Sequence, residues 1–551
     1  MPWRTGVRRY TDVSLWRTGV RRYTDVSLWR TGVRRYAAVS LWRTGVRRYT
    51  KLDMEMKEQE ITLTDILTAR EERVAIQNAL LAEYRVPVIS FTMNMAGPVK
   101  VTALSHRAFL WGMEQLRLGF IQNRMAVKKE YTRSLPTGDE GYFAIDAPAE
   151  RVKALCVEIE EGKRIGRFFD MDVIGADGNK LERGSERSCI VCGRPGRDCA
   201  SRRLHTVAEL QAATAGQFER GLRSQDQERI AALATRALLE EVAVTPKPGL
   251  VDRANHGAHL DMDLMTFQAS AAALTPYWGE CWRTGQSVGG GVLRSEASPL
   301  GDAPRGSTTD EATGNRQQAT GDGRTGPSAP LRFPQDDKLE VISPAETFAA
   351  LRPLGKNAER RMLAATGGVN THKGAIFTLG VLCGAIGRLW TAEAGFPDVE
   401  AILNEAAAMT RETLEKELPA ANWNTAGEAL YRKYGARGIR GQVADGLPAV
   451  REISLPVFKR LLASGLDRNH AAAVTLLHLI ANVEDTNLLH RGGPAGAAWA
   501  RDAAGALISD GRVPSLQEIS ELDRQFIQRN LSPGGCADLL AVTLFLESLH
   551  S

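Results

Sequence analysis

The pattern of apolar and polar residues differs between the two halves of the chain. In the first half, apolar positions spaced among charges predict an amphipathic helix over residues 63–84, and a second helix is predicted over 149–161. Short apolar runs predict strands over residues 86–93, 142–146 and 167–174. Helices and strands in this order are typical of an α/β domain.

The second half of the chain has helical periodicity. Apolar side chains recur at the spacing of one helix face, as in Ile230, Leu233 and Ala234. Residues 374–387 carry no charge but are too few to cross a bilayer, so we expect a buried helix there. Glycines in this segment weaken an isolated helix but allow neighbouring backbones to approach closely. We therefore expect a mostly all-α C-terminal domain.

Two segments fit neither pattern. Residues 1–50 repeat a 13-residue unit, with Trp at positions 3, 16, 29 and 42, that has neither helical nor strand periodicity, so we expect a disordered tail. Residues 289–337 are rich in Gly, Ser, Thr and Pro and have no apolar period, which predicts a low-complexity insertion. The predicted domains are residues 51–218 and residues 219–551, with the insertion inside the second domain.

Composition and charge narrow the class of protein. Seven cysteines in 551 residues are too few for a disulfide framework, and no apolar secretory segment follows Met1, so we expect a cytoplasmic protein without a membrane partner. The net charge of +5 depends on residues 1–50, which hold twelve Arg and two Asp, and the remainder of the chain is mildly acidic. An acidic remainder gives no electrostatic support for a nucleic-acid partner.

Asp170 and Asp172 are the first candidate catalytic residues. On a strand both carboxylates point to one face, while Phe169 and Met171 point to the other. Mg²⁺ favours one or two protein carboxylates together with phosphate oxygens, and the preceding Arg167 could approach a triphosphate. The alternative interpretation is an ordinary solvated strand face.

Cys189, Cys192, Cys199 and His205 are a second candidate site. Three thiolates and one imidazole can complete a tetrahedral Zn²⁺ site, although the second Cys pair is incomplete. Free thiols beside a basic loop are the alternative. The loop would suit an acidic partner because it is rich in arginine: Arg187, Arg194, Arg197, Arg202 and Arg203.

These segments together resemble the apo-citrate lyase phosphoribosyl-dephospho-CoA transferases, over about residues 55–215. The matching segments are residues 88–92, 97–100, 166–173 and 187–205. The resemblance implies a nucleotidyltransferase-like fold. It also implies transfer of a triphosphoribosyl-dephospho-CoA precursor to a serine of the acyl carrier (gamma) subunit of citrate lyase, with release of diphosphate. Asp170 and Asp172 would then hold the metal, and we expect Lys100 and Arg167 to contact phosphate.

Rigid loops and helix starts carry the candidate chemistry of the second half. Lys247 lies between two prolines that stiffen its loop, and Asp252 follows in a stretch dense in carboxylates and imidazoles. His372 and Lys373 lead into the uncharged helix, whose first amides could face a phosphate. We expect Asn370 or the following threonine to cap that helix.

Three later segments add charged groups and free amides. Arg437 and Arg440 lie in a glycine-punctuated loop that suits a polyphosphate or an ordinary tight turn. We expect Asp485 to point inward as a metal ligand or general base, with Arg491 nearby to bind phosphate. Residues 531–538 open the last helix and supply further amides. None of these segments is a Walker A loop.

Five of these segments, in the same order, resemble the triphosphoribosyl-dephospho-CoA synthases over about residues 225–551. The resemblance implies that ATP is joined to 3′-dephospho-CoA with displacement of adenine and retention of the triphosphate. Such a displacement needs a base for the hydroxyl, a proton for adenine and stabilisation of an oxocarbenium-like centre, while Mg²⁺ screens the triphosphate. The clusters around Asp252, His372 and Asp485 offer these groups, and the sequence leaves open which carboxylate is the base.

The favoured interpretation is a bifunctional enzyme that makes the citrate lyase prosthetic-group precursor and attaches it to the carrier protein. The equivalent pair of reactions for the malonate decarboxylase carrier is the alternative enzyme. A zinc-bearing, nucleic-acid-binding regulator that uses the Arg/Trp/Tyr tail is an alternative of another class, and a degraded or artificial fusion is the third.

Overall fold

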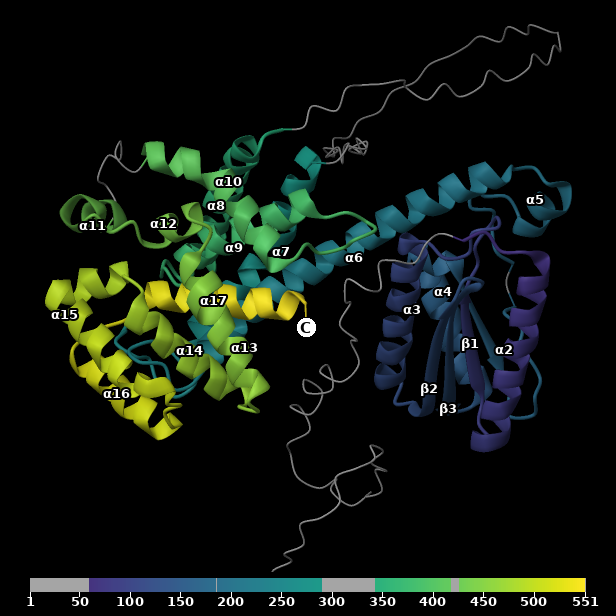
Figure 1. Ribbon diagram of the computed structural model, residues 1–551, viewed down its shortest axis with the longest axis horizontal. Helices are drawn as coiled ribbons and strands as arrows, with labels where there is room; N and C mark the ends of the chain where they lie inside the picture. Colours follow the sequence, from purple (N-terminus) through teal and green to yellow (C-terminus); the bar gives the residue numbers. More distant parts are fainter. Residues whose placement is uncertain (1–58, 185, 290–341, 418–425, 551) are drawn as a thin grey trace, which may run out of the picture. The chain divides into compact units, whose positions relative to one another are not determined.

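The computed structural model describes residues 59–184, 186–289, 342–417 and 426–550 (Figure 1). The predicted repeat tail at 1–50 lies outside these residues, as does the predicted insertion at 289–337 apart from Gly289. The described residues form an α/β part followed by a helical part, in the order that the periodicity predicts.

A four-stranded antiparallel sheet is the centre of the α/β part, with the strand order β2-β3-β1-β4. Its strands are β1 (Val88–Met93), β2 (Ala126–Leu135), β3 (Gly138–Asp146) and β4 (Phe169–Ile174). This order places β4 at one edge of the sheet, where one side of the strand remains open to other groups.

Helices cover both faces of this sheet (Figure 1). They are α2 (Leu63–Tyr84), α3 (Ala103–Gln122) and α4 (Ala149–Gly162). The ring of Phe109 on α3 stacks on Phe91 of β1 at 4.9 Å between centroids, whereas Leu80 of α2 packs against Tyr142 on the opposite face. The two apolar layers follow from the alternation of side chains along each strand.

The strand predicted over residues 167–174 starts later than expected. Arg164–Phe168 is a 3-10 helix, η3, so Arg167 does not lie on the strand. Gly166 allows this turn because a Cβ there would meet the carbonyl oxygen of Ile159 at 2.3 Å. The other helices and strands predicted in this half are confirmed, with shifted ends.

One long helix, α6 (Val207–Ala243), carries the chain out of the α/β part. Its first turn is closed by a capping box between Thr206 and Glu209. The ring of Phe218 lies 4.7 Å from the ring of Phe168, and α6 packs farther along against α7. The predicted domain boundary at 218–219 therefore falls inside a continuous helix.

The helical part contains α7 (Leu264–Gly289), α8 (Pro344–Ala365), α9 (Lys373–Leu389), α10 (Val399–Glu417), α11 (Ala426–Tyr434), α12 (Gly438–Ala444), α13 (Leu455–Ala463), α14 (Arg468–Asn482), α15 (Thr486–Leu507), α16 (Leu516–Gln528) and α17 (Gly534–Leu549). The uncharged segment forms α9 and is buried, as predicted. Across the described ranges, none of the helices has both the length and the apolar character needed to span a membrane.

Glycines bring α7 and α9 into backbone contact. A Cβ on Gly387 would meet the carbonyl oxygen of Trp282 at 2.1 Å, and a Cβ on Gly285 would meet that of Gly384 at the same distance. The predicted close approach is confirmed. Because neither helix can move away without losing the packing of Trp282, these contacts fix the position of α9 near its C-terminal end.

Candidate active sites

Asp170 and Asp172 lie on one face of the edge strand β4. Phe169 and Met171 alternate with them and are fully buried on the opposite face. The predicted alternation is confirmed, and it leaves both carboxylates on the side of the strand away from the aromatic core.

The neighbouring strand supplies hydroxyl groups beside the two carboxylates. The register places Asp170 opposite Thr92 and Asp172 opposite Ser90. The side chain of Asp170 reaches solvent, yet the surrounding protein and then the charge of Asp172 raise its pKa. Lys180 donates to Asp172 Oδ2 at 2.6 Å. Two like charges with one cationic partner form an arrangement that a divalent cation would neutralise.

Glu160, at the end of α4, ties β4 to two arginines. Its side chain is buried, and its Oε1 accepts the Met171 amide at 2.8 Å. Its Oε2 accepts from Arg183 at 2.7 Å and from Arg187 at 2.8 Å. Arg187 also donates to the carbonyl oxygen of Phe169 at 2.7 Å. Sequence reasoning missed Glu160 because nothing local distinguishes it from its acidic neighbours.

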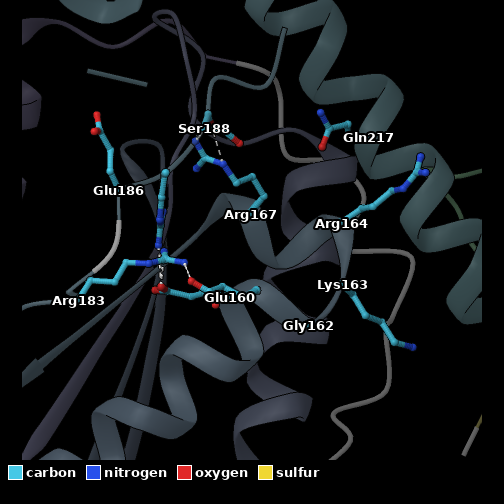
Figure 2. Close-up of a pocket in the computed structure, with 11 residues that line it drawn as sticks. Glu160, Gly162, Lys163, Arg164, Arg167, Arg183, Glu186, Ser188 and Gln217 are labelled. Carbon is cyan, nitrogen blue, oxygen red and sulfur yellow. Dashed lines mark hydrogen bonds and ion pairs between the residues drawn. The ribbon is translucent and has the colours of Figure 1, made fainter. Parts of the chain in front are cut away.

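These arginines line a pocket of about 470 Å³ (Figure 2). Its basic lining residues are Lys163, Arg164, Arg167, Arg183 and Arg187. Figure 2 shows Arg183 bound to Glu160 on one wall and Arg167 bound to Ser188 on another. A concave site of this size with several cations suits an anionic group of a small molecule.

The structure separates the two residues expected to contact phosphate. Arg167 lies in the pocket, where burial and then the charges of Arg187 and Arg183 lower its pKa. A bound anion would relieve this repulsion. Lys100 is not among the lining residues, and its ammonium donates to the carbonyl oxygen of Met95 at 2.7 Å.

The four residues of the predicted zinc site converge. The ligand atoms of Cys189, Cys192, Cys199 and His205 all lie within 4.8 Å of one another. Cys192 Sγ is 3.3 Å from Cys199 Sγ and 3.3 Å from His205 Nε2. Hydrogen bonds, first from the backbone of Arg194 and then from His205, lower the pKa of Cys192 to about 6. This sulfur is therefore poised to be a thiolate.

In the helical part, Lys247 is completely buried against the end of α6. Its ammonium donates to the backbone oxygen of Glu241 at 2.8 Å and to the carboxylate of the same residue at 2.5 Å. Burial raises the pKa of Glu241, although the charge of Lys247 opposes the rise. Asp252 holds this loop closed, since its carboxylate accepts the amides of Lys247, Ala254 and Asn255.

His372 lies at the start of α9 with one ring nitrogen free of a protein partner. Its Nδ1 is 2.7 Å from Ser270 Oγ, and its buried Nε2 has no hydrogen-bond partner among the residues that the structure describes. Burial and then the charge of Lys247 lower the pKa of His372 to about 3, so the imidazole is neutral near pH 7. A neutral ring held through one nitrogen presents the other to a ligand.

The sequence predicted that the first amides of α9 would face a phosphate, but a protein carboxylate occupies one of them. The expected cap is wrong: His372 occupies the N-cap position without a side-chain cap bond. The amide of Ala375 instead hydrogen-bonds to Asp538 of α17, and a Cβ on Gly374 would meet Asp538 Oδ2 at 1.9 Å. Burial and then the charges of Glu241 and Asp485 raise the pKa of Asp538. Its sequence signal is an acid at the fifth residue of a helix that two glycines open.

Asp485 is the N-cap of α15 and joins it to α17. Its Oδ1 accepts the amides of Asn487 at 2.7 Å and Leu488 at 3.1 Å, and its Oδ2 accepts the amide of Cys536 at 2.8 Å. The side chain is nearly fully buried and points inward, as expected. Three backbone donors leave this carboxylate little capacity for a further ligand.

Arg437 and Arg440 flank the start of α12. Arg437 pairs with Asp445 at 2.7 Å, and Arg440 lies 3.8 Å from Glu428. A Cβ on the intervening Gly438 would lie 2.9 Å from the methyl group of Thr486, so this loop adjoins the start of α15.

The other two predicted phosphate ligands also have protein partners. Lys373 lies 3.5 Å from the carboxylate of Glu359. Arg491 donates to the carbonyl oxygen of Ala258 at 2.8 Å and lies 3.1 Å from His259 Nδ1. It therefore ties α15 to the loop that follows Lys247. The structure thus gathers Lys247, His372, Asp485 and Asp538 around the starts of α9, α15 and α17.

Comparison with known families identifies both parts. The family model "CitG: ATP:dephospho-CoA triphosphoribosyl transferase" matches residues 227–551, and "CitX: Apo-citrate lyase phosphoribosyl-dephospho-CoA transferase" matches residues 61–220. Protein CitXG of Haemophilus influenzae is 33% identical over 508 residues, which cover 89% of this chain and 97% of that protein. The chain belongs to the bifunctional CitXG family.

Further relatives agree with this family. Protein CitXG of Leuconostoc mesenteroides is 29% identical, over 89% of this chain and 98% of its own length. The 2-(5''-triphosphoribosyl)-3'-dephosphocoenzyme-A synthase of Klebsiella pneumoniae is 36% identical over 58% of this chain and 91% of its own length. The chain is thus a transferase that combines a CitX part and a CitG part, and both act in making the citrate lyase prosthetic group.

Proposed function

We propose that the CitX part binds the triphosphate of its substrate between β4 and the cationic pocket. Asp170 and Asp172 would hold Mg²⁺, which would supply positive charge to the phosphates, and Arg167 with the Glu160-bound Arg187 would take the remaining charge. Clustered guanidiniums are good phosphate ligands, and the metal would neutralise the departing diphosphate. The acceptor is a serine of the acyl carrier subunit of citrate lyase, in a nucleotidyltransferase-like reaction.

One observation carries this proposal: Glu160 bonds β4 and both Arg183 and Arg187 at once. Glu160 therefore connects the strand that carries Asp170 and Asp172 to the arginines of the cationic pocket. A solvated strand face would need no such link.

For the CitG part, we infer a centre formed by Lys247, His372 and Asp538. The neutral His372 presents Nε2 to the substrates, and Ser270 orients the ring through Nδ1. Asp538 has a raised pKa, which suits a group that protonates the departing adenine. Which tautomer His372 holds decides whether Nε2 accepts the dephospho-CoA hydroxyl proton or donates a hydrogen bond.

Asp252 and Asp485 have a positioning role in this proposal. Backbone amides saturate both carboxylates, one closing the loop of Lys247 and the other joining the starts of α15 and α17. Lys373 lies at the start of α9, and Arg437 and Arg440 lie at the start of α12. These three cations would bind the ATP triphosphate in place of the carboxylates that they now contact.

Separate assays of the two reactions test the assignment. The full chain is given ATP, Mg²⁺ and 3′-dephospho-CoA, free adenine is measured, and apo carrier protein is then added and weighed. Asp170→Asn should reduce carrier labelling by about 100-fold and leave adenine release unchanged. His372→Gln should reduce adenine release by about 100-fold while labelling from supplied intermediate continues.

Asp177→Asn is the matched control for the first variant. Asp177 lies in the turn after β4 and accepts only from Asn179 in that turn, so labelling should remain normal. Joint loss of both reactions in Asp170→Asn would contradict two independent centres. Labelling that continues without Mg²⁺ or any other added divalent cation would contradict the metal role of the two carboxylates.

A further inference from the structure

We propose that Cys189, Cys192, Cys199 and His205 bind one Zn²⁺ ion, and that this metal holds one wall of the cationic pocket in place. Tetrahedral zinc with bonds of about 2.0–2.3 Å separates its ligand atoms by about 3.5–3.8 Å. The observed separations of 3.3 Å, with all four ligand atoms within 4.8 Å, therefore need only small shifts to accept the ion.

The backbone around the first two cysteines has the shape of a metal-binding knuckle. The amide of Cys189 donates to the carbonyl oxygen of Arg194 at 2.6 Å, and the amide of Gly193 donates back to Cys189 at 3.0 Å. Gly193 has a φ of 74°, a conformation that few other residues adopt without strain. This turn points the two sulfurs in one direction.

The other two ligands come from a short helix and from the residue before the N-cap of a long one. Cys199 lies in the short helix α5 (Gly196–Arg202), and His205 directly precedes Thr206, the N-cap of α6. A disulfide between Cys192 and Cys199 would explain only two of the four converging groups. Zinc explains all four.

Charge around the cluster also fits a zinc–thiolate centre. Three thiolates, one neutral imidazole and Zn²⁺ carry a net charge of −1. Exposed arginines surround the ligands in the sequence and can balance this charge: Arg194, Arg197, Arg202 and Arg203.

The cluster and the pocket share one backbone segment. Ser188, next to Cys189, accepts from Arg167 through its carbonyl oxygen, and the carbonyl oxygen of Arg187 accepts the amide of Gly196 at 2.8 Å. Gln217 of α6 donates to the carbonyl oxygen of Ile190 at 3.3 Å. Release of the metal should therefore loosen the backbone of residues 187–190, and with it the Ser188 carbonyl oxygen that holds Arg167. The link between the metal and the pocket rests on the proposed function, in which this pocket binds the substrate triphosphate.

Metal analysis of the purified full chain tests the site without any activity assay. The expected result is one equivalent of zinc per chain, and Co²⁺ exchanged into the protein should show thiolate-to-metal absorption. Cys192→Ser and His205→Ala should lower zinc affinity by at least about 100-fold. His205→Cys should retain the ion because four thiolates also complete the site.

Cys156→Ala is the control, since Cys156 is a buried cysteine of α4 outside the cluster. It should keep its zinc. The site is refuted by a chain that holds no zinc after growth with added zinc, by a Cys192–Cys199 disulfide in the freshly isolated protein, or by equal zinc content in Cys192→Ser and wild type.

A depletion experiment tests the link to the pocket. Zinc is removed with a chelator, the chain is returned to Mg²⁺ buffer, and both reactions are followed. Carrier labelling should fall by about tenfold or more through a higher KM for the intermediate, adenine release should be unchanged, and added zinc should restore labelling. Unchanged carrier labelling after confirmed zinc loss would refute the proposal that zinc positions the pocket wall, but would not refute the zinc site itself. A zinc-loaded chain that labels no carrier refutes the proposed function and leaves the metal site standing.

Discussion

Gly387→Ala tests whether backbone contact between α7 and α9 supports the synthase centre. The new Cβ would lie 2.1 Å from the carbonyl oxygen of Trp282 and 3.0 Å from its carbonyl carbon. A carbon and an oxygen in van der Waals contact lie more than about 3 Å apart, so the helices must separate by roughly 1 Å. A backbone oxygen cannot change rotamer to make room.

The cost can be estimated from known overpacking. Strain of this kind typically costs about 1–3 kcal/mol, and this contact is at the severe end because it is with backbone. Replacing a helical glycine by alanine returns up to about 1 kcal/mol. A net loss of about 2–3 kcal/mol should lower the midpoint of thermal unfolding by roughly 3–5 °C, because the unfolding entropy of a part of about 300 residues is large.

Gly355→Ala is the matched control. Gly355 lies inside α8, and its new Cβ would meet only the Tyr277 hydroxyl at 3.5 Å, an ordinary contact. This variant should melt at the wild-type temperature or slightly above it. The assay is thermal unfolding of the full chain together with adenine release, which should fall in Gly387→Ala because α9 positions His372. If Gly387→Ala melts with or above Gly355→Ala, the reasoning from backbone contact is refuted.

Three further predictions follow from buried charges. In the folded chain the pKa of His372 is about 3, below its usual 6.5, so below about pH 6.5 only the unfolded state binds a proton at this ring. The free energy of unfolding should therefore fall as the pH falls below about 6.5. In urea unfolding, wild type should lose roughly 2 kcal/mol more between pH 7 and 5 than His372→Gln. Arg133→Gln removes one of two arginine partners of the buried Glu140 and should cost about 2 kcal/mol, because Arg73 still pairs with that carboxylate. The more exposed Arg117→Gln should cost under about 1 kcal/mol, and equal thermal shifts would contradict this difference. Glu160→Gln should weaken the ion pairs with Arg183 and Arg187 and raise the KM for the intermediate in carrier labelling by about tenfold. An unchanged KM would show that the carboxylate does not position these arginines for the substrate.

Periodicity was enough to predict the elements that carry the sites. Alternating burial put Asp170 and Asp172 on one face of a strand, and the uncharged run became the buried helix α9. The spacing of the cysteines also predicted which groups would meet. These features depend on neighbours within a few residues, so a local pattern describes them.

The partners of buried charges could not be predicted in this way. Glu160 meets Arg183 and Arg187 from more than twenty residues away, and Asp538 meets Ala375 from across the helical part. The start of β4 was misplaced for a similar reason, because Gly166 turns against the carbonyl oxygen of Ile159. Such contacts depend on tertiary packing, which overrides the preference of a short segment.

The same limitation explains why the sequence could not rank the carboxylates. Asp252 and Asp485 stand in conspicuous motifs, but each accepts three backbone amides, so most of the lone pairs of each carboxylate are already used. Burial raises the pKa of Asp485 as it raises those of Asp170 and Asp538, but like charges add to the rise only at the latter two. Counting the amide donors around each acid therefore identifies Asp252 and Asp485 as carboxylates that hold a loop or two helix starts together, and no pattern within a few residues of either acid reveals this.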